Sequence, residues 1–253
     1  MLVLADASSA QNASSTAANE ANNPLTPKIT VNFHDQAAPV LFNVDPGSNA
    51  FLLRGVVPHK LGGTRQLFRY TLPIVTSPDG QGSTVSGLGD LNIFDLFPFL
   101  WKRARMELAV GPQLTIPTAT NTATGTGKWQ AGLATIAVAP RRWGIVGTLI
   151  TWQHSFAGNG TRPTQNNFSA QPLVIYNFPK GWYLRSSATW IFDLERGNFA
   201  IPVGAGLGKV WVLRSGTVVN LFAEPQMTIA HSGTGQPKFQ VFAGLNLQFP
   251  IGK

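Results

Sequence analysis

The sequence predicts an all-β protein: a closed antiparallel transmembrane β-barrel of about twelve strands, with short periplasmic turns and longer extracellular loops. Only 12% of the 253 residues are charged, roughly half the share found in ordinary soluble domains. Segments of about ten residues alternate between apolar side chains and polar or small ones. The connections between these segments also alternate, from tight turns to longer polar stretches, which is typical of outer-membrane barrels.

Composition argues against several other classes of protein. No run approaches the roughly 18 apolar residues that a membrane-spanning helix needs. The chain has no cysteine, which excludes disulfide frameworks and thiolate metal sites. A net charge of +8 could indicate nucleic-acid binding, but the basic residues are scattered, and their clusters at 102–105 and 141–142 fall at predicted turns. We therefore expect no nucleic-acid partner and no cofactor.

We predict that residues 1–27 form a disordered leader or the remnant of a signal peptide, and that residues 28–253 form the barrel. Residues 1–23 are mostly Ala, Ser, Asn and Thr, a composition that cannot form a core of its own. A short apolar run at 2–4 precedes the small residues Ser8 and Ala10, as at a signal-peptidase site. We expect either a start upstream of Met1 or a plain leader, and the segment could reach into the barrel.

The first half of the chain contains five predicted strands with two distinct faces. Asp95 falls on the apolar face of its segment, beside Leu91 and Ile93, which predicts a bulge or a strand end near water. Pro112 lies inside another segment, where its missing N–H would weaken a central strand. The five segments are residues 28–34, 50–57, 66–75, 88–97 and 107–116.

The second half predicts seven more strands, of which the last has the clearest pattern. Its odd-numbered residues from Phe239 to Phe249 are all apolar, and its even-numbered residues are mostly polar or small. We expect the apolar face to meet lipid and the strand to close the barrel against residues 28–34. The seven segments are residues 129–138, 143–156, 168–178, 182–192, 199–211, 218–230 and 238–249.

The polar faces favour a membrane barrel over a soluble sandwich. They carry Gly, Ser, Thr, Asn and Gln with isolated charges, whereas a water-facing sheet would carry many Lys and Glu. Aromatic residues recur near strand ends, as membrane interfaces require. Gly244, Leu247 and Phe249 have the spacing of a C-terminal signal for the barrel-insertion machinery, from which Phe242 departs. We therefore expect outer-membrane lipid and that machinery as partners, and the bacterial outer membrane as the location.

Five stretches together resemble a bacterial outer-membrane family of porin-like transporters. This family is grouped with the meta-pathway phenol-degradation channels and is sometimes mislabelled "neuromedin U". The resemblance covers most of residues 24–250 and implies a transport role, with apolar or aromatic solutes as an expectation. The stretches are residues 71–75 (TLPIV), 87–91 (GLGDL), 111–120 (GPQLTIPTAT), 127–132 (GKWQAG) and 203–210 (VGAGLGKV).

Three functions are compatible with such a barrel. We favour a channel that passes a small-molecule solute through a narrow or plugged lumen, because about twelve strands lie between small filled barrels and open porins. The alternatives are a non-conducting structural or adhesive barrel that acts through its loops, and an outer-membrane enzyme. His154 and Ser155 are adjacent and so point to opposite faces, and the four histidines lack metal-site spacing.

The polar faces supply the candidate lumen residues. Their charged members would set the electric field that a solute meets, or would pair with one another and close the lumen. The candidates are Arg54, Arg69, Asp90, Glu107, Gln113, Arg185, Asn220, Glu224, Gln226 and Asn246.

Overall fold

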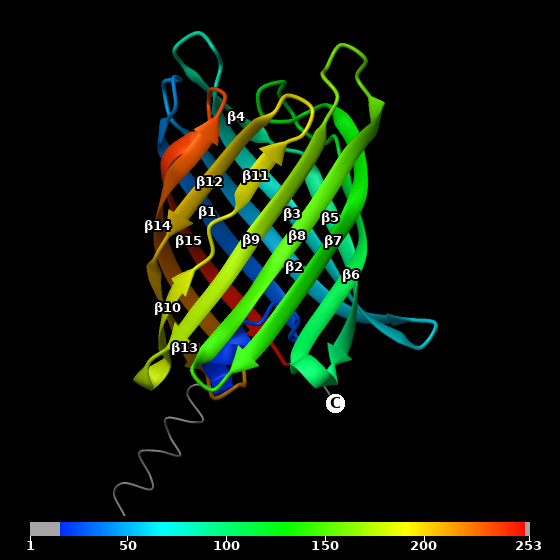
Figure 1. Ribbon diagram of the computed structural model, residues 1–253, viewed down its shortest axis with the longest axis vertical. Helices are drawn as coiled ribbons and strands as arrows, with labels where there is room; N and C mark the ends of the chain where they lie inside the picture. The colour runs from blue at the N-terminus through cyan, green and yellow to red at the C-terminus, as the bar shows by residue number, and fades with distance from the viewer. Residues whose placement is uncertain (1–15, 251–253) are drawn as a thin grey trace, which may run out of the picture.

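A computed structural model describes residues 16–250, so residues 1–15 of the predicted leader, with the signal-peptidase site expected near Ser8 and Ala10, lie outside the described residues. Its strands form one closed antiparallel barrel of twelve spans (Figure 1). Two spans are interrupted, one made of β10 and β11 and the other of β12 and β13, while β4 pairs only with β3. The strands are β1 (Ile29–Leu41), β2 (Ser48–Leu61), β3 (Thr64–Pro78), β4 (Thr84–Leu88), β5 (Leu91–Trp101), β6 (Met106–Ile116), β7 (Lys128–Arg141), β8 (Gly144–Gly158), β9 (Asn166–Asn177), β10 (Trp182–Ser186), β11 (Trp190–Asp193), β12 (Asn198–Gly204), β13 (Gly206–Val212), β14 (Val218–Ser232) and β15 (Pro237–Phe249).

The first and last strands close the barrel, as predicted. β1 and β15 are antiparallel, with Ile29 opposite Phe249 and His34 opposite Gly244. β15 also pairs with β14 on its other side, so neither strand has a free edge. Closure is what a bilayer requires, because an unpaired backbone group in hydrocarbon costs several kcal/mol.

The outer surface is apolar and carries aromatic clusters near both ends. Leu133, Leu207 and Met227 are all more than half exposed, as expected for side chains that meet lipid. Lys209 lies between Trp182 and Trp211, with its Nζ 4.8 and 5.2 Å from their ring centroids. A lysine with its charge among interfacial tryptophans is typical of a membrane boundary. The chain is therefore an outer-membrane β-barrel.

Turns and loops divide between the two ends as predicted. The tight connections include the short 3-10 helices η1 (Lys102–Ala104) and η2 (Pro179–Gly181). The longer connections, such as residues 117–127, lie at the opposite end together with the β3–β4 extension. Arg162 stabilises the 117–127 loop through its guanidinium, which donates to the carbonyl oxygens of Thr122, Gly125 and Thr126. The end with the tight turns is the periplasmic end.

Two predicted strands are interrupted, and one predicted bulge is absent. The segment 182–192 leaves the sheet at residues 187–189, and the segment 199–211 is broken at Ala205. The physical reason for the first break is a lumen carboxylate, because Glu224 Oε1 accepts the backbone N–H of Ser187 at 2.8 Å. Neither alternative predicted at Asp95 is observed: β3 and β5 keep their register through Asp95, so there is no bulge, and β5 continues to Trp101, so the strand does not end there. The Asp95 carboxylate lies 3.0 Å from His59 Nε2.

Candidate functional site

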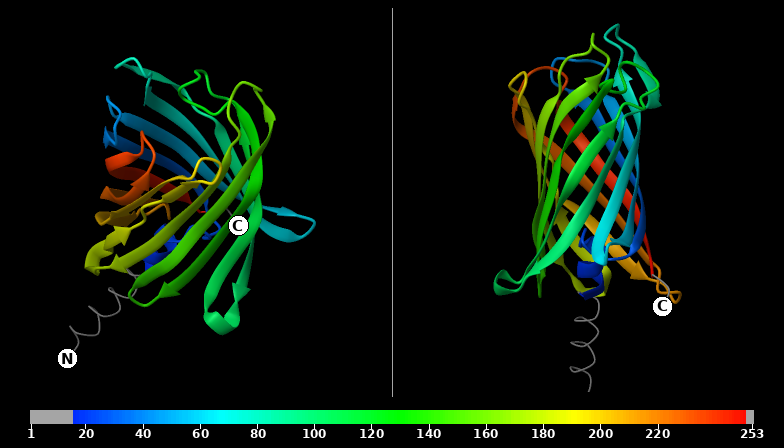
Figure 2. Two further views of the ribbon diagram at one scale, coloured as in Figure 1. Left: turned by 45° about the horizontal axis from the view of Figure 1, so that its top comes forward. Right: turned by 90° about the vertical axis from the view of Figure 1, so that its right-hand side faces the viewer.

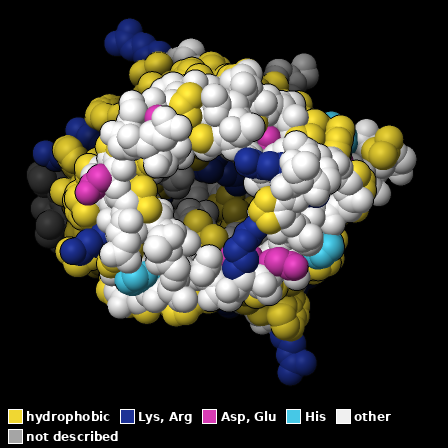
Figure 3. Space-filling model, turned by 90° about the horizontal axis from the view of Figure 1, so that it is seen from above, with side chains coloured by type: hydrophobic (Ala, Val, Ile, Leu, Met, Phe, Trp, Pro, Cys, Tyr) yellow, Lys and Arg dark blue, Asp and Glu magenta, His cyan; other side chains and the backbone are white. Residues whose placement is uncertain are grey.

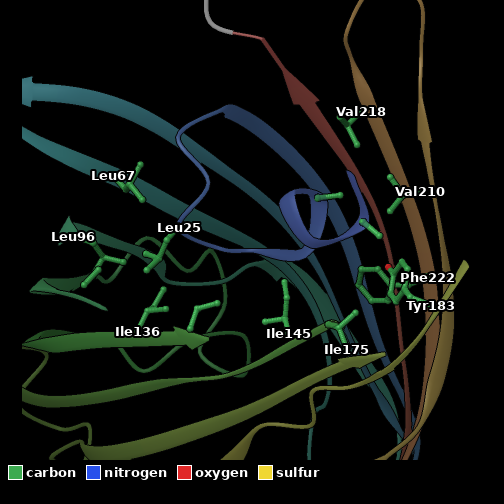
Figure 4. Close-up of a cluster of buried hydrophobic side chains, with 14 of the residues drawn as sticks. Leu25, Leu67, Leu96, Ile136, Ile145, Ile175, Tyr183, Val210, Val218 and Phe222 are labelled. Carbon is green, nitrogen blue, oxygen red and sulfur yellow. The ribbon is translucent and has the colours of Figure 1, made fainter. Parts of the chain in front are cut away.

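Residues 16–27, here called the inner segment, lie inside the periplasmic end of the barrel. Residues 16–22 are helical, and within residues 16–250 no helix is long and apolar enough to cross a membrane. Ala18 and Ala21 are buried against the wall, and Leu25 joins the same cluster. Figure 4 shows the helix between Val210 and Val218 on one side and Ile145 and Ile175 on the other.

The order of residues 16–27 differs from the disorder that composition predicts for this part of the leader. The inner segment does not form a core of its own; it completes one that the barrel wall supplies. Its alanines are small enough to fit closely against that wall, so the low apolar content is no obstacle to burial.

Hydrogen bonds attach the inner segment to strands around the circumference. Asn23 Nδ2 donates to Glu107 Oε2 of β6 at 2.9 Å, and Asn19 Nδ2 donates to the Arg141 carbonyl of β7 at 2.9 Å. On the far side, Gln248 of β15 donates to the Ala21 carbonyl at 2.9 Å. Asn220 of β14 donates to Asn22 at 3.1 Å. The segment therefore closes much of the periplasmic end.

Above the inner segment lies a chamber of about 170 Å³ with two chemically different walls. Strands β1, β2, β3 and β15 supply polar and basic side chains. Strands β7, β8 and β9, on the opposite side of the barrel, supply mainly aliphatic ones. Seen from the loop end, the molecule is hollowed, and Lys or Arg side chains are visible inside the hollow (Figure 3). The aliphatic wall consists of Ile136, Val138, Leu149, Leu173 and Ile175.

Arg54 and Arg69 form the basic part of the polar wall. They project from adjacent strands, because Arg54 pairs with Thr71 while Arg69 pairs with Val56. Neither arginine forms an ion pair with any carboxylate of the described residues. Their Nε atoms are buried without a hydrogen-bond partner, and the Arg69 guanidinium lies 5.1 Å from the Phe94 ring centroid.

Arg185 and Glu224 neutralise each other in the same lumen. Arg185 Nε donates to Glu224 Oε2 at 2.9 Å, and the Glu224 side chain is fully buried. The Arg185 guanidinium also stacks on Phe222, 3.5 Å from the ring centroid. Because Glu224 accepts further hydrogen bonds from Ser187 and Gln226, its charge is fully engaged. This pair holds the interrupted span in place.

His34 contributes no charge to the chamber. Its Nδ1 lies 3.2 Å from Arg54 Nη1, and a guanidinium can only donate a hydrogen bond, so Nδ1 accepts and carries no proton. Its Nε2 then donates to Asn246 Oδ1 at 2.7 Å. His34 is therefore neutral, and the chamber retains two cations without counter-ions.

The other predicted lumen residues lie at different heights of the barrel. Asn246 lines the chamber, and Gln226 binds Glu224 above it. Asn220 and Glu107 lie lower, where they attach the inner segment. Asp90 lies at the loop end, where its carboxylate accepts the Thr126 N–H and hydroxyl at 2.7 Å each. The remaining candidate, Gln113, is buried on the lumen face of β6.

Sequence reasoning missed the asparagines of the inner segment. Asn19, Asn22 and Asn23 are spaced three and four residues apart within an Ala-rich run, which places them on one side of a helix. That spacing was the available signal. It marks residues that bind a surrounding polar surface, here the lumen.

A second cavity opens through the wall beside the inner segment. β3 and β5 pair only from Leu67 to Thr71, and nearer the periplasm the β2–β3 hairpin bends away from β5 and β6 (Figure 2). The cavity has a volume of about 560 Å³ and is lined by Leu25, Pro98 and Leu100 among others. Leu67 borders both this cavity and the chamber.

The described residues contain no cluster of His, Cys, Asp or Glu that could hold a metal ion. The predicted separation of His154 and Ser155 is also observed. His154 is exposed, while the Ser155 hydroxyl accepts the Gln165 N–H at 3.0 Å. These two residues therefore do not act on one another.

The same fold occurs in an outer membrane channel from Pseudomonas putida F1. The two chains are 14% identical and superpose with a TM-score of 0.67, over 90% of this chain and 99% of the other. The outer membrane phospholipase A from Escherichia coli gives a TM-score of 0.46 at 13% identity, over 94% and 98% of the two chains. No family model matches the sequence, and no curated protein matches it. The resemblance to phenol-degradation porins therefore stays a prediction, while the outer-membrane barrel is confirmed.

Proposed function

We propose that this protein is a passive outer-membrane channel for small solutes with apolar or aromatic parts, and that the inner segment restricts its periplasmic end. The observation that carries the proposal is the chamber, which is hollow toward the loop end and ends below at the inner segment. A barrel that served only as a scaffold would gain nothing from a lumen with two chemically different walls.

The second cavity gives a solute a way past the inner segment. It adjoins the chamber at Leu67 and leads outward between the β2–β3 hairpin and β5. Its lining combines apolar residues with His59, Lys60 and Glu107. A solute with an apolar body would lose little solvation free energy on this route. The fold shared with a protein described as a channel agrees with this proposal.

Planar-bilayer recording on the reconstituted full chain tests channel function. We expect small, steady current steps with a preference for anions, because the chamber cations Arg54 and Arg69 lack counter-ions. Replacing both by Gln should reduce the anion preference, which the reversal potential in a salt gradient measures. Arg214→Gln, a change of the same charge at an exposed turn, is the matched control and should leave the reversal potential unchanged.

Two outcomes would refute the channel. If correctly folded protein gives no current above the lipid background and no solute flux in liposome swelling, the protein is better explained as a non-conducting barrel. If the protein instead hydrolyses the lipid of these vesicles, it is better explained as an enzyme.

A further inference from the structure

We propose that the chamber is a binding site for an apolar monocarboxylate, with the carboxylate between Arg54 and Arg69 and the apolar body against β7, β8 and β9. This inference rests on the proposed function, since it names the class of solute. Its closing experiment measures binding directly and so can fail independently of transport.

The two arginines favour an anion that none of residues 16–250 supplies. On neighbouring strands they are diagonal partners, a relation that places Cα atoms about 7–8 Å apart. Two buried like charges on neighbouring strands repel each other, and each loses solvation by burial. A carboxylate between them would relieve both costs.

The unsatisfied donors fit a planar, bidentate acceptor. Arg54 Nε and Arg69 Nε are buried without partners, and only one Arg54 nitrogen is engaged, by His34. A guanidinium presents its donors as a rigid fork that matches the two oxygens of a carboxylate. The neutral His34 keeps the Arg54 fork oriented without competing for the anion.

The aliphatic wall opposite the arginines indicates that the remainder of the ligand is apolar. Leu149 and Leu173, which are only partly buried, offer aliphatic surface without charge, and Phe94 lies beside the Arg69 guanidinium. A small hydrophilic anion would leave this surface in contact with water, whereas an aromatic or branched body would bury it. The chamber volume of about 170 Å³ accommodates a single ring or a short branched chain.

Titration calorimetry on the folded full-length barrel in detergent tests the site, with benzoate as the probe. Benzamide has the same ring without the charge, and acetate has the charge without the ring. We expect benzoate to bind at least about tenfold more tightly than either. Arg54→Gln and Arg69→Gln should each weaken benzoate binding about tenfold, as the loss of a charge-assisted hydrogen bond predicts. Arg214→Gln should bind benzoate as the unmodified protein does.

The variants Arg54→Lys and Arg69→Lys keep the positive charge, and they replace the Gln variants in this test if those fold poorly. These Lys variants should bind benzoate with intermediate affinity, because an ammonium cannot make the bidentate contact. Equal binding of benzoate and benzamide would overturn the proposal, as would wild-type affinity in the Arg54→Gln/Arg69→Gln double variant. Acetate binding as tightly as benzoate would overturn the assignment of the apolar wall. Benzoate binding without conductance would support the carboxylate site and refute only the channel function.

Discussion

Arg185 and Arg54 both face the lumen, yet their surroundings give them different roles. Arg185 is held by Glu224, by Ser187 and by the Phe222 ring, so its charge is neutralised within the wall. Among residues 16–250, Arg54 has only a neutral histidine as a polar partner. The sequence placed both on the lumen face, but it could not separate them, because Glu224 is 39 residues from Arg185 and the pairing depends on how the barrel closes.

Breaking the Arg185–Glu224 pair should destabilise the barrel strongly. Arg185→Gln leaves a buried carboxylate without its cation, which costs about 3–5 kcal/mol. Urea unfolding in detergent, followed by the shift in mobility on cold gels, measures the loss. Arg196→Gln removes a more exposed partner, whose side chain pairs with Asp193, and should cost less than about 1 kcal/mol. Equal losses in the two variants would contradict a structural role for the buried pair.

Gly208 should not tolerate even one added methyl group. A Cβ atom there would lie 2.2 Å from Cζ of Tyr183, whose hydroxyl donates to Asn220 at 2.5 Å. Gly208→Ala should therefore displace this ring and lower the free energy of unfolding by about 1–3 kcal/mol. Gly160→Ala has open space around it and serves as the control in the same unfolding assay. An unchanged midpoint for Gly208→Ala would show that the ring has room to move.

At the scale of the strands, the alternation of side chains predicted which face of a strand meets lipid, whereas contacts between distant residues decided where strands are interrupted. The faces of β6 and β15 follow directly from alternation, because each side chain meets either lipid or lumen. The break at residues 187–189 has no local signal, since it depends on Glu224 of β14. The sequence allowed residues 1–27 to reach into the barrel, but the contacts that order the inner segment were hidden, because they depend on a wall formed by residues far along the chain.

The outward faces make a prediction about the membrane. Leu133 lies in the middle of β7 and is 54% exposed. Leu133→Arg should destabilise the folded barrel by about 2–4 kcal/mol, as for a charge near the bilayer midplane. Leu61→Arg, at the tip of the β2–β3 hairpin where Leu61 is 68% exposed, should have little effect. The free energy of unfolding from lipid vesicles is measured for both variants. Equal losses would contradict the placement of Leu133 in the apolar band that meets lipid.

For the whole molecule, the proposed function makes the barrel, the chamber and the inner segment parts of one route with a restriction at its periplasmic end. At the loop end, Arg162 and Asp90 stabilise the 117–127 loop through hydrogen bonds. The periplasmic end is narrowed by a segment that several strands bind at once. Loosening that segment should therefore widen the route without changing the wall.

The most direct test is the single-channel current of Asn23→Asp. This change places a carboxylate against Glu107, where an amide now donates at 2.9 Å, and should repel the inner segment from β6. We predict a measurable current for the unmodified protein, a larger one for Asn23→Asp, and a return toward the unmodified value for Asn23→Asp/Glu107→Gln, in which an amide again faces an acid. Equal currents in all three would contradict closure by the inner segment, and no current in any of them would contradict the channel.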